Sequence, residues 1–163
     1  MPAAEFEAFY HAYVARVYRF VFYRVGARVE LAQDLTQEVF LKAFEAFERY
    51  DPAKGKSAWI YTIARNHLIN HHAKERSHVD IEEVDDSIWL SEDGREQFAQ
   101  NDDERRLLDD IDTLDAEEAR LVRMKYLEGW GFEDLAEVFG KTSGALRVQA
   151  GRALKKLRSK VKK

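Results

Sequence analysis

The chain has 163 residues, and its 45% of hydrophobic and 12% of aromatic residues supply apolar material for one medium-sized domain or two small ones. The lack of cysteine excludes disulfides and thiolate metal sites, and the lack of a long apolar run or a signal peptide predicts a cytoplasmic chain without membrane insertion. The net charge of -4 excludes an evenly basic nucleic-acid binder, and two prolines with almost no alternating β-branched residues predict an all-α fold.

Two amphipathic helices are predicted in the N-terminal part of the chain. From Glu5 onward, aromatic and aliphatic residues recur at three- and four-residue spacing, and Gly26 is expected to end the first helix. A second helix is predicted to begin near Glu30. Its buried stripe is expected to contain Ala32, Leu35, Val39, Phe40, Ala43, Phe44, Ala46 and Phe47.

The opposite face of this second helix is acidic and polar. It carries Asp34, Gln37, Glu38 and Glu45, with one apolar residue, Leu41, among them. An acidic exposed face is most often simply solvated. An exposed leucine within it favours a surface that binds a partner.

A short basic loop separates the second helix from a third. Pro52 disfavours the α conformation at Asp51 and so ends the second helix, and the loop Ala53–Lys56 follows. Ser57 is predicted to be the N-cap of a helix that runs from Ala58 to about Arg76.

Polar residues on the third helix are candidates for function. Asn66 and Asn70 lie one turn apart on its flank. His67 and His71 raise the alternative of a metal site, but no acidic residue has the helical phase to complete a ligand set. We therefore expect no metal, and interpret these histidines as packing or phosphate-facing residues.

The stretch from His78 to Glu104 breaks the helical periodicity and is predicted to be an acidic linker. It contains eleven acidic residues and one arginine. Its apolar residues predict that it adheres to its own domains or to a partner, since a purely solvated tether lacks such side chains. These residues are Ile81, Val84, Ile88, Trp89, Leu90 and Phe98.

The C-terminal part has the pattern of a helix-turn-helix. Asp115 and Glu118 have the spacing of a capping box, and Gly129 is expected to close the helix that follows them. A short amphipathic helix comes next, and Gly140 suits the left-handed turn after it. Either Thr142 or Ser143 is expected to cap the final helix.

The final helix is strongly basic. The segment Lys141–Lys163 contains nine lysines and arginines and no acidic residue. A merely solvated helix normally interleaves acidic residues at i, i+4, so this pattern favours DNA binding. The side chains predicted to face inward are Leu146, Ala150, Ala153, Leu154, Leu157 and Val161.

Three blocks of the sequence, DLTQEVFLKAF, WIYTIARN and FEDLAEVFGKTSGALRVQAGRALKKL, resemble in order and spacing regions two and four of bacterial sigma-70-family RNA polymerase sigma factors. The compact form is similar to the extracytoplasmic-function (ECF) group. The resemblance implies two small helical domains, a region 2 bundle over 1–77 and a region 4 helix-turn-helix over 105–163, joined by an acidic linker over 78–104. It covers nearly the whole chain except the linker.

The resemblance also implies a function without catalysis or cofactors. A sigma factor directs core RNA polymerase to specific promoters and helps to open the duplex. Its implied partners are core polymerase, through the β′ clamp helices and the β flap, promoter DNA and an anti-sigma factor, and the free chain is expected to be a monomer. The residues implied to bind the polymerase are Asp34, Gln37, Glu38 and Leu41.

Two further sets of residues are implied to bind promoter DNA. For the single strand of the minus-ten element these are Lys54, Lys56, Ser57, Trp59, Arg65, Asn66, Asn70, Lys74 and Arg76. For the minus-thirty-five duplex they are Thr142, Ser143, Arg147, Val148, Gln149, Arg152, Lys155 and Lys156. The chain departs from the family pattern at Gly131, Lys141 and the pair Val148-Gln149.

Two hypotheses from other classes stand beside this one. The first is a helix-turn-helix regulator that is not a sigma factor and whose N-terminal helices form a dimer. The second is a metalloenzyme that uses His67 and His71 on a helical scaffold.

Overall fold

The structure of the chain, a computed structural model, describes residues 2–75, 89–90 and 92–161. Every regular element in this part of the chain is helical, which confirms the all-α prediction. The helices are α1 (Pro2–Arg24), α2 (Val29–Ala46), α3 (Lys56–Glu75), α4 (Glu92–Phe98), α5 (Asp102–Asp112), α6 (Ala116–Val122), α7 (Phe132–Phe139) and α8 (Ser143–Val161). Short 3-10 turns, η1 (Phe47–Arg49) and η2 (Pro52–Lys54), follow α2, and a π-helical segment, η4 (Arg123–Glu128), continues α6.

The first three helices pack side by side because each buries one apolar stripe. Val17 and Phe20 of α1, Val39 of α2 and Ile60 of α3 are buried in the same core. Gly26 has φ +70 and ends α1 as predicted. Among the described residues, no helix combines the length and the apolar character needed to cross a lipid bilayer.

Two local predictions in this half are wrong. Phe44 is 53% exposed rather than buried, because Ala43 takes the inward position and the Phe44 ring packs edge-on against Phe6. Ser57 is not an N-cap, because α3 already begins at Lys56 and the Gly55 carbonyl accepts the hydrogen bond of its first turn.

The acidic linker is partly helical and lies against α1. Helix α4 falls within the stretch where no periodicity was predicted. Trp89 stacks on Tyr23 with ring centroids 4.4 Å apart, and Leu90 is buried beside them. Phe98 packs edge-on against Tyr23. The linker therefore adheres to its own chain, whereas Ile81, Val84, Ile88 and Arg76 lie outside the described residues.

The C-terminal half forms the predicted helix-turn-helix, and its caps explain the helix boundaries. Asp115 caps α6 by accepting a hydrogen bond from the Glu118 amide at 2.9 Å. Gly140, with φ +66, makes the turn after α7, and Thr142 caps α8 through the Ala145 amide at 3.1 Å. Leu146, Ala150, Ala153 and Leu157 of α8 are buried as predicted, and Leu154 is half-buried.

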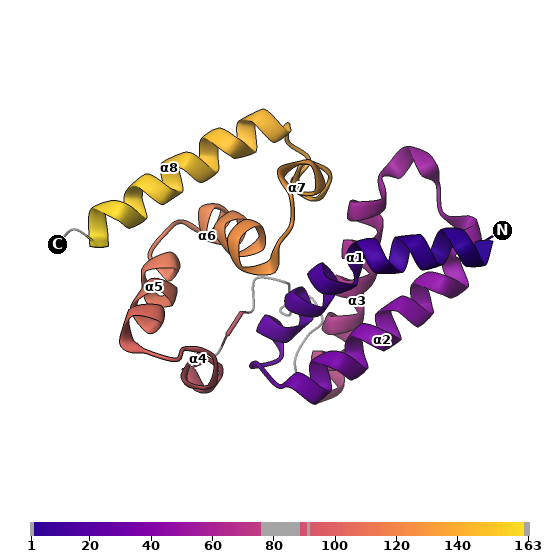
Figure 1. The fold of residues 1–163 in the computed structure, drawn as a ribbon, viewed down its shortest axis with the longest axis horizontal. Helices are drawn as coiled ribbons and strands as arrows, with labels where there is room; N and C mark the ends of the chain where they lie inside the picture. Colours follow the sequence, from indigo (N-terminus) through magenta and orange to yellow (C-terminus); the bar gives the residue numbers. More distant parts are fainter. Residues whose placement is uncertain (1, 76–88, 91, 162–163) are drawn as a thin grey trace.

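The two halves are packed against each other and share one core. Leu121, Met124, Trp130 and Leu135 belong to the same buried cluster as the residues of α1, α2 and α3. Figure 1 shows α1, α2 and α3 at one end of the molecule, α4, α5, α6 and α8 at the other, and α7 at the junction. In this arrangement α7 lies over the beginning of α3.

Candidate functional site

The acidic face of α2 is open to solvent along its length. Asp34, Gln37 and Glu38 are exposed, and Leu41 is 60% exposed, as the helical phase predicted. Phe44 continues the same face three residues beyond Leu41 and places a second large apolar side chain on it. The sequence alone does not place Phe44 on this face, because its spacing fits the buried stripe as well.

The acidic face of α2 is joined to α3 by a hydrogen bond. The imidazole Nε2 of His67 lies 2.6 Å from a carboxylate oxygen of Glu38. Both side chains line a hollow of about 580 Å³ that also contains Asp34, Asn70 and Lys74. The structure thus places residues predicted to bind polymerase and residues predicted to bind the minus-ten strand around one hollow.

The outer surface of α3 presents amides to solvent. Asn66 and Asn70 are exposed, and Arg65 donates a hydrogen bond of 3.4 Å to the Asn66 side chain. Trp59 is half-buried two turns earlier, about 10 Å along the helix axis from Asn66. A single base therefore does not contact both in this arrangement, although neither side chain is sealed in the core.

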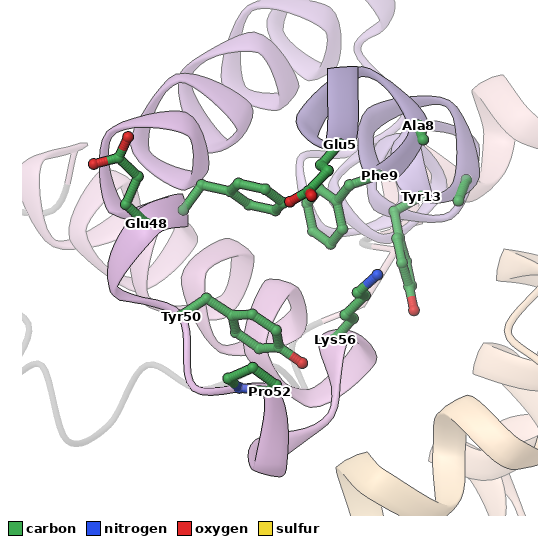
Figure 2. A pocket seen from close by; sticks show the side chains of 10 residues that line it. Glu5, Ala8, Phe9, Tyr13, Glu48, Tyr50, Pro52 and Lys56 are labelled. Atoms are coloured by element: carbon green, nitrogen blue, oxygen red, sulfur yellow. The ribbon is translucent and has the colours of Figure 1, made fainter. Parts of the chain in front are cut away.

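Trp59 lies beside an aromatic hollow of about 900 Å³ between α1 and the loop before α3. Phe9 and Tyr13 line it from α1, Tyr50 lines it from the loop, and Lys56 lines it from the first turn of α3, as Figure 2 shows. Glu5 and Glu48 also line it, so an aromatic wall on which a base could stack is flanked by one cation and two carboxylates. Helical spacing predicts these aromatic residues of α1 only as part of its apolar face, and no pattern in the sequence marks Tyr50 as a site residue.

Ser57 is only 1% exposed, because α7 covers it. Its hydroxyl lies 2.8 Å from the Tyr13 hydroxyl and donates a hydrogen bond of 2.6 Å to Asp134 of α7. Burial raises the pKa of Tyr13 above its usual value; the Ser57 hydrogen bond opposes this rise and the negative charge of Asp134 adds to it. Ser57 is therefore inaccessible to DNA while α7 lies against the start of α3.

The basic loop before α3 is covered at the same point. Glu137 of α7 accepts a hydrogen bond of 3.4 Å from the Ala58 amide, at the positive end of α3. A Cβ atom at position 55 would overlap the end of the Glu137 side chain, which would have to shift, and the φ of +67 at Gly55 favours glycine. Lys54 and Lys56 remain exposed on either side.

The outer face of α8 is basic and accessible. Arg147, Arg152 and Lys155 are exposed, and Val148 is 55% exposed. Lys156 is exposed as well and forms an ion pair of 2.8 Å with Glu118 of α6. The remaining residues predicted to contact the minus-thirty-five element are Thr142, which is exposed, and Ser143 and Gln149, which are half-buried.

The histidines of α3 are engaged with carboxylates. His71 lies 3.2 Å from Glu75, and His67 contacts Glu38. Within the part of the chain that the structure describes, no group of three or more potential ligands is placed to hold a metal ion. The alternative of a metalloenzyme therefore gains no support from the geometry.

Comparison with known proteins gives a family for each half of the chain. The family described as Sigma-70 region 2 matches residues 9–78, and the family described as Sigma-70, region 4 matches residues 104–157. The first segment contains most of α1 and all of α2 and α3. The second contains α7 and most of α8, which form the helix-turn-helix. Helix α4 lies in the acidic stretch between them.

Individual relatives of the chain are also named RNA polymerase sigma factors. The chain is 30% identical over 161 residues to the ECF RNA polymerase sigma factor BldN of Streptomyces coelicolor, covering 95% of this chain and 61% of that protein. It is 30% identical over 153 residues to the RNA polymerase sigma factor CarQ of Myxococcus xanthus, covering 94% of this chain and 87% of that protein. The sigma factor RpoE of Bartonella quintana, solved in complex with the anti-sigma factor NepR, has a similar fold, with a TM-score of 0.57, 21% identity and 97% of each chain covered.

Proposed function

The chain belongs to the extracytoplasmic-function group of sigma-70-family RNA polymerase sigma factors, and we propose that it directs core RNA polymerase to specific promoters and helps to open the duplex there. The observation that carries this proposal is the order of the surfaces along one chain. An acidic helix face comes first, an amide- and aromatic-rich helix second and a basic helix-turn-helix last. The regulator that is not a sigma factor is not favoured, since the region 2 match accounts for its N-terminal helices.

The acidic face of α2 is the proposed polymerase-binding surface. Its exposed carboxylates suit a basic partner such as the β′ clamp helices, and charge complementarity of this kind fixes orientation and speeds association. Leu41 and Phe44 add two exposed apolar side chains that the partner would cover. We therefore include Phe44 in the polymerase-binding surface.

Helix α3 and the aromatic hollow are the proposed site for the unpaired minus-ten strand. A flipped base needs an aromatic surface for stacking and a polar group for its edge. Tyr50 and Trp59 supply the first, and Asn66 supplies the second for another nucleotide of the strand. Capture of exposed bases would favour the open duplex without nucleotide hydrolysis, so the chain itself needs no catalytic site.

Helix α8 is the proposed reader of the minus-thirty-five duplex. Arg147 and Val148 lie in its first turns, where a recognition helix meets base edges, and Arg152 and Lys155 lie further along, where phosphates are contacted. The same C-terminal half would contact the β flap. These steps take place in the cytoplasm, where the polymerase meets its promoter.

An anti-sigma factor is the proposed third partner. RpoE of Bartonella quintana was solved with such a protein bound. In this chain, a protein that covered the acidic face of α2 would block the polymerase and keep the chain inactive. Without any partner, the chain would be a monomer.

Binding to core polymerase tests the proposal. The double variant Asp34→Lys/Glu38→Lys is expected to lose at least about tenfold in affinity, because it replaces attraction by repulsion at the proposed surface. Glu7→Lys/Glu133→Lys is the matched control, since it makes the same change of charge at exposed positions away from this face. Pull-down of core polymerase in which Asp34→Lys/Glu38→Lys binds as well as the control would refute the assignment.

A further inference from the structure

We propose that Val148 determines part of the sequence specificity of helix α8, by packing its isopropyl group against the 5-methyl group of a thymine in the major groove. The inference rests on the proposed function, in which α8 reads the minus-thirty-five duplex. It adds the side chain that reads one base pair of this element and the chemical group that is read.

Val148 is an isolated apolar side chain on a basic helix. It is 55% exposed, whereas Leu146, Leu154 and Leu157 of the same helix are buried or half-buried. A single exposed valine is ordinary on a protein surface. This one lies in the second turn of α8, in the part of a recognition helix that faces base edges. Its position therefore gives its exposure a use.

The neighbours of Val148 on the helix surface leave its side chain uncovered. Residues three and four positions away lie beside it, which are Gly144 and Ala145 on one side and Gly151 and Arg152 on the other. All four are exposed, and a Cβ atom at Gly144 or Gly151 would lie in open space. The backbone around Val148 can therefore approach a base pair closely, and the isopropyl group projects beyond it.

The cations near the start of α8 lie on other sides of the helix-turn-helix. The guanidinium carbon of Arg147 lies 5.4 Å from the centre of the Phe132 ring of α7, beside which α8 begins (Figure 1). Lys141 forms an ion pair with Glu117 of α6. Arg147 is about 100° around the helix from Val148, so the two side chains reach different base pairs. Neither cation is held toward the base that Val148 would contact.

An exposed valine distinguishes the bases by the groups that they present in the major groove. Thymine presents a methyl group there, which an apolar side chain can cover. Cytosine and adenine present an amino group instead. Covering that group with valine would leave a donor without a hydrogen bond, which is unfavourable. Val148 therefore favours thymine both through contact with the methyl group and through rejection of these two bases.

Deoxyuridine tests this contact, because it lacks only the 5-methyl group of thymidine. The protein used is the complex of core polymerase with the full chain, on a promoter from which it gives a run-off transcript. Each thymine of the minus-thirty-five block, on either strand, is replaced in turn by deoxyuridine. One replacement is expected to lower the affinity of the complex for the promoter about fourfold, which corresponds to the burial of one methyl group.

Val148→Ala is the variant that removes the contact. It is expected to bind the thymine promoter and the deoxyuridine promoter about equally, because the isopropyl group is gone. The matched control is Val29→Ala, which shortens a valine that is 51% exposed on α2 and should keep the difference. The readout is the ratio of two affinities measured with the same protein, so a general loss of stability in either variant does not change it.

Val148→Gln tests whether the side chain at this position selects the base. Glutamine can form two hydrogen bonds with adenine in the major groove. On a promoter library, the variant is therefore expected to prefer adenine in place of thymine at this base pair and to keep the preferences of the wild type elsewhere.

The outcomes separate this inference from the proposed function. A block in which no thymine is sensitive to deoxyuridine, or a sensitive thymine that stays equally sensitive in Val148→Ala, would overturn the inference and leave the proposed function intact. An unchanged base preference in Val148→Gln would overturn it as well. A wild type that gives no promoter-specific transcript would contradict the proposed function and the inference together.

Discussion

Tyr23 links the first helix to both the linker and the C-terminal half. Its ring stacks on Trp89, and its side chain lies in the field of the buried Glu128. Burial, reinforced by the negative charge of Glu128, raises the pKa of Tyr23 to about 12 from a usual value of 10.0. The folded chain therefore favours the neutral phenol.

This shift predicts a loss of stability in alkali. The folded pKa lies above the unfolded value, so the contribution of Tyr23 is complete below pH 10.0 and is lost as the pH rises through about 12. Urea unfolding across this pH range is expected to show a smaller alkaline loss in Tyr23→Phe than in wild type, because phenylalanine keeps the stack and cannot ionise. The same alkaline loss in both proteins would contradict the assignment.

At single residues, the sequence predicted exposure well and tertiary contacts poorly. Helical phase alone placed Asp34 and Leu41 on the solvent side of α2, and the structure confirms both. Helical phase could not decide whether Phe44 is buried or exposed, because Phe44 lies at the edge of the buried stripe. The burial of Ser57 could not be predicted either, because the residue that covers it, Asp134, is 77 positions away in the sequence.

Among the elements, those bounded by local chemistry could be predicted. The Asp115 cap, the Gly129 and Gly140 turns and the Thr142 cap depend on residues close in sequence, and the structure contains all of them. Helix α4 has no apolar period and lies in an acidic stretch, so its formation depends on packing. Gly94 approaches the Gly26 backbone closely, an approach that no local pattern encodes.

The testable prediction about a single helix concerns the binding of α8 to duplex DNA. Replacing the exposed pair in Arg152→Ala/Lys155→Ala is expected to weaken binding to duplex DNA similarly for all sequences. The slope of log K against log salt concentration should fall by about 0.9 for each phosphate that the variant no longer neutralises. Fluorescence anisotropy at several salt concentrations measures this slope.

The matched control for α8 is Lys42→Ala/Arg106→Ala, which removes two exposed cations from other helices. It should leave the slope unchanged. An equal effect of both double variants would mean that the net charge of the chain, rather than the face of α8, determines binding.

Over the whole molecule, the surfaces proposed to bind polymerase and promoter DNA differ in their exposure to solvent. The acidic face of α2 and the basic face of α8 are open, whereas the start of α3 is covered by α7. The sequence predicts two domains with a linker between them, and these boundaries stay a prediction. It could not predict that both halves share one buried core, because that core joins helices far apart in sequence.

Run-off transcription on a promoter library is the measurement that tests the central claim most directly. Core polymerase with the wild-type chain is expected to start transcription at a defined subset of promoters that share two short sequence blocks. Asp34→Lys/Glu38→Lys should abolish these transcripts, while Glu7→Lys/Glu133→Lys should retain them. The same set of transcripts from core polymerase with and without the chain would contradict its role as a promoter-directing subunit.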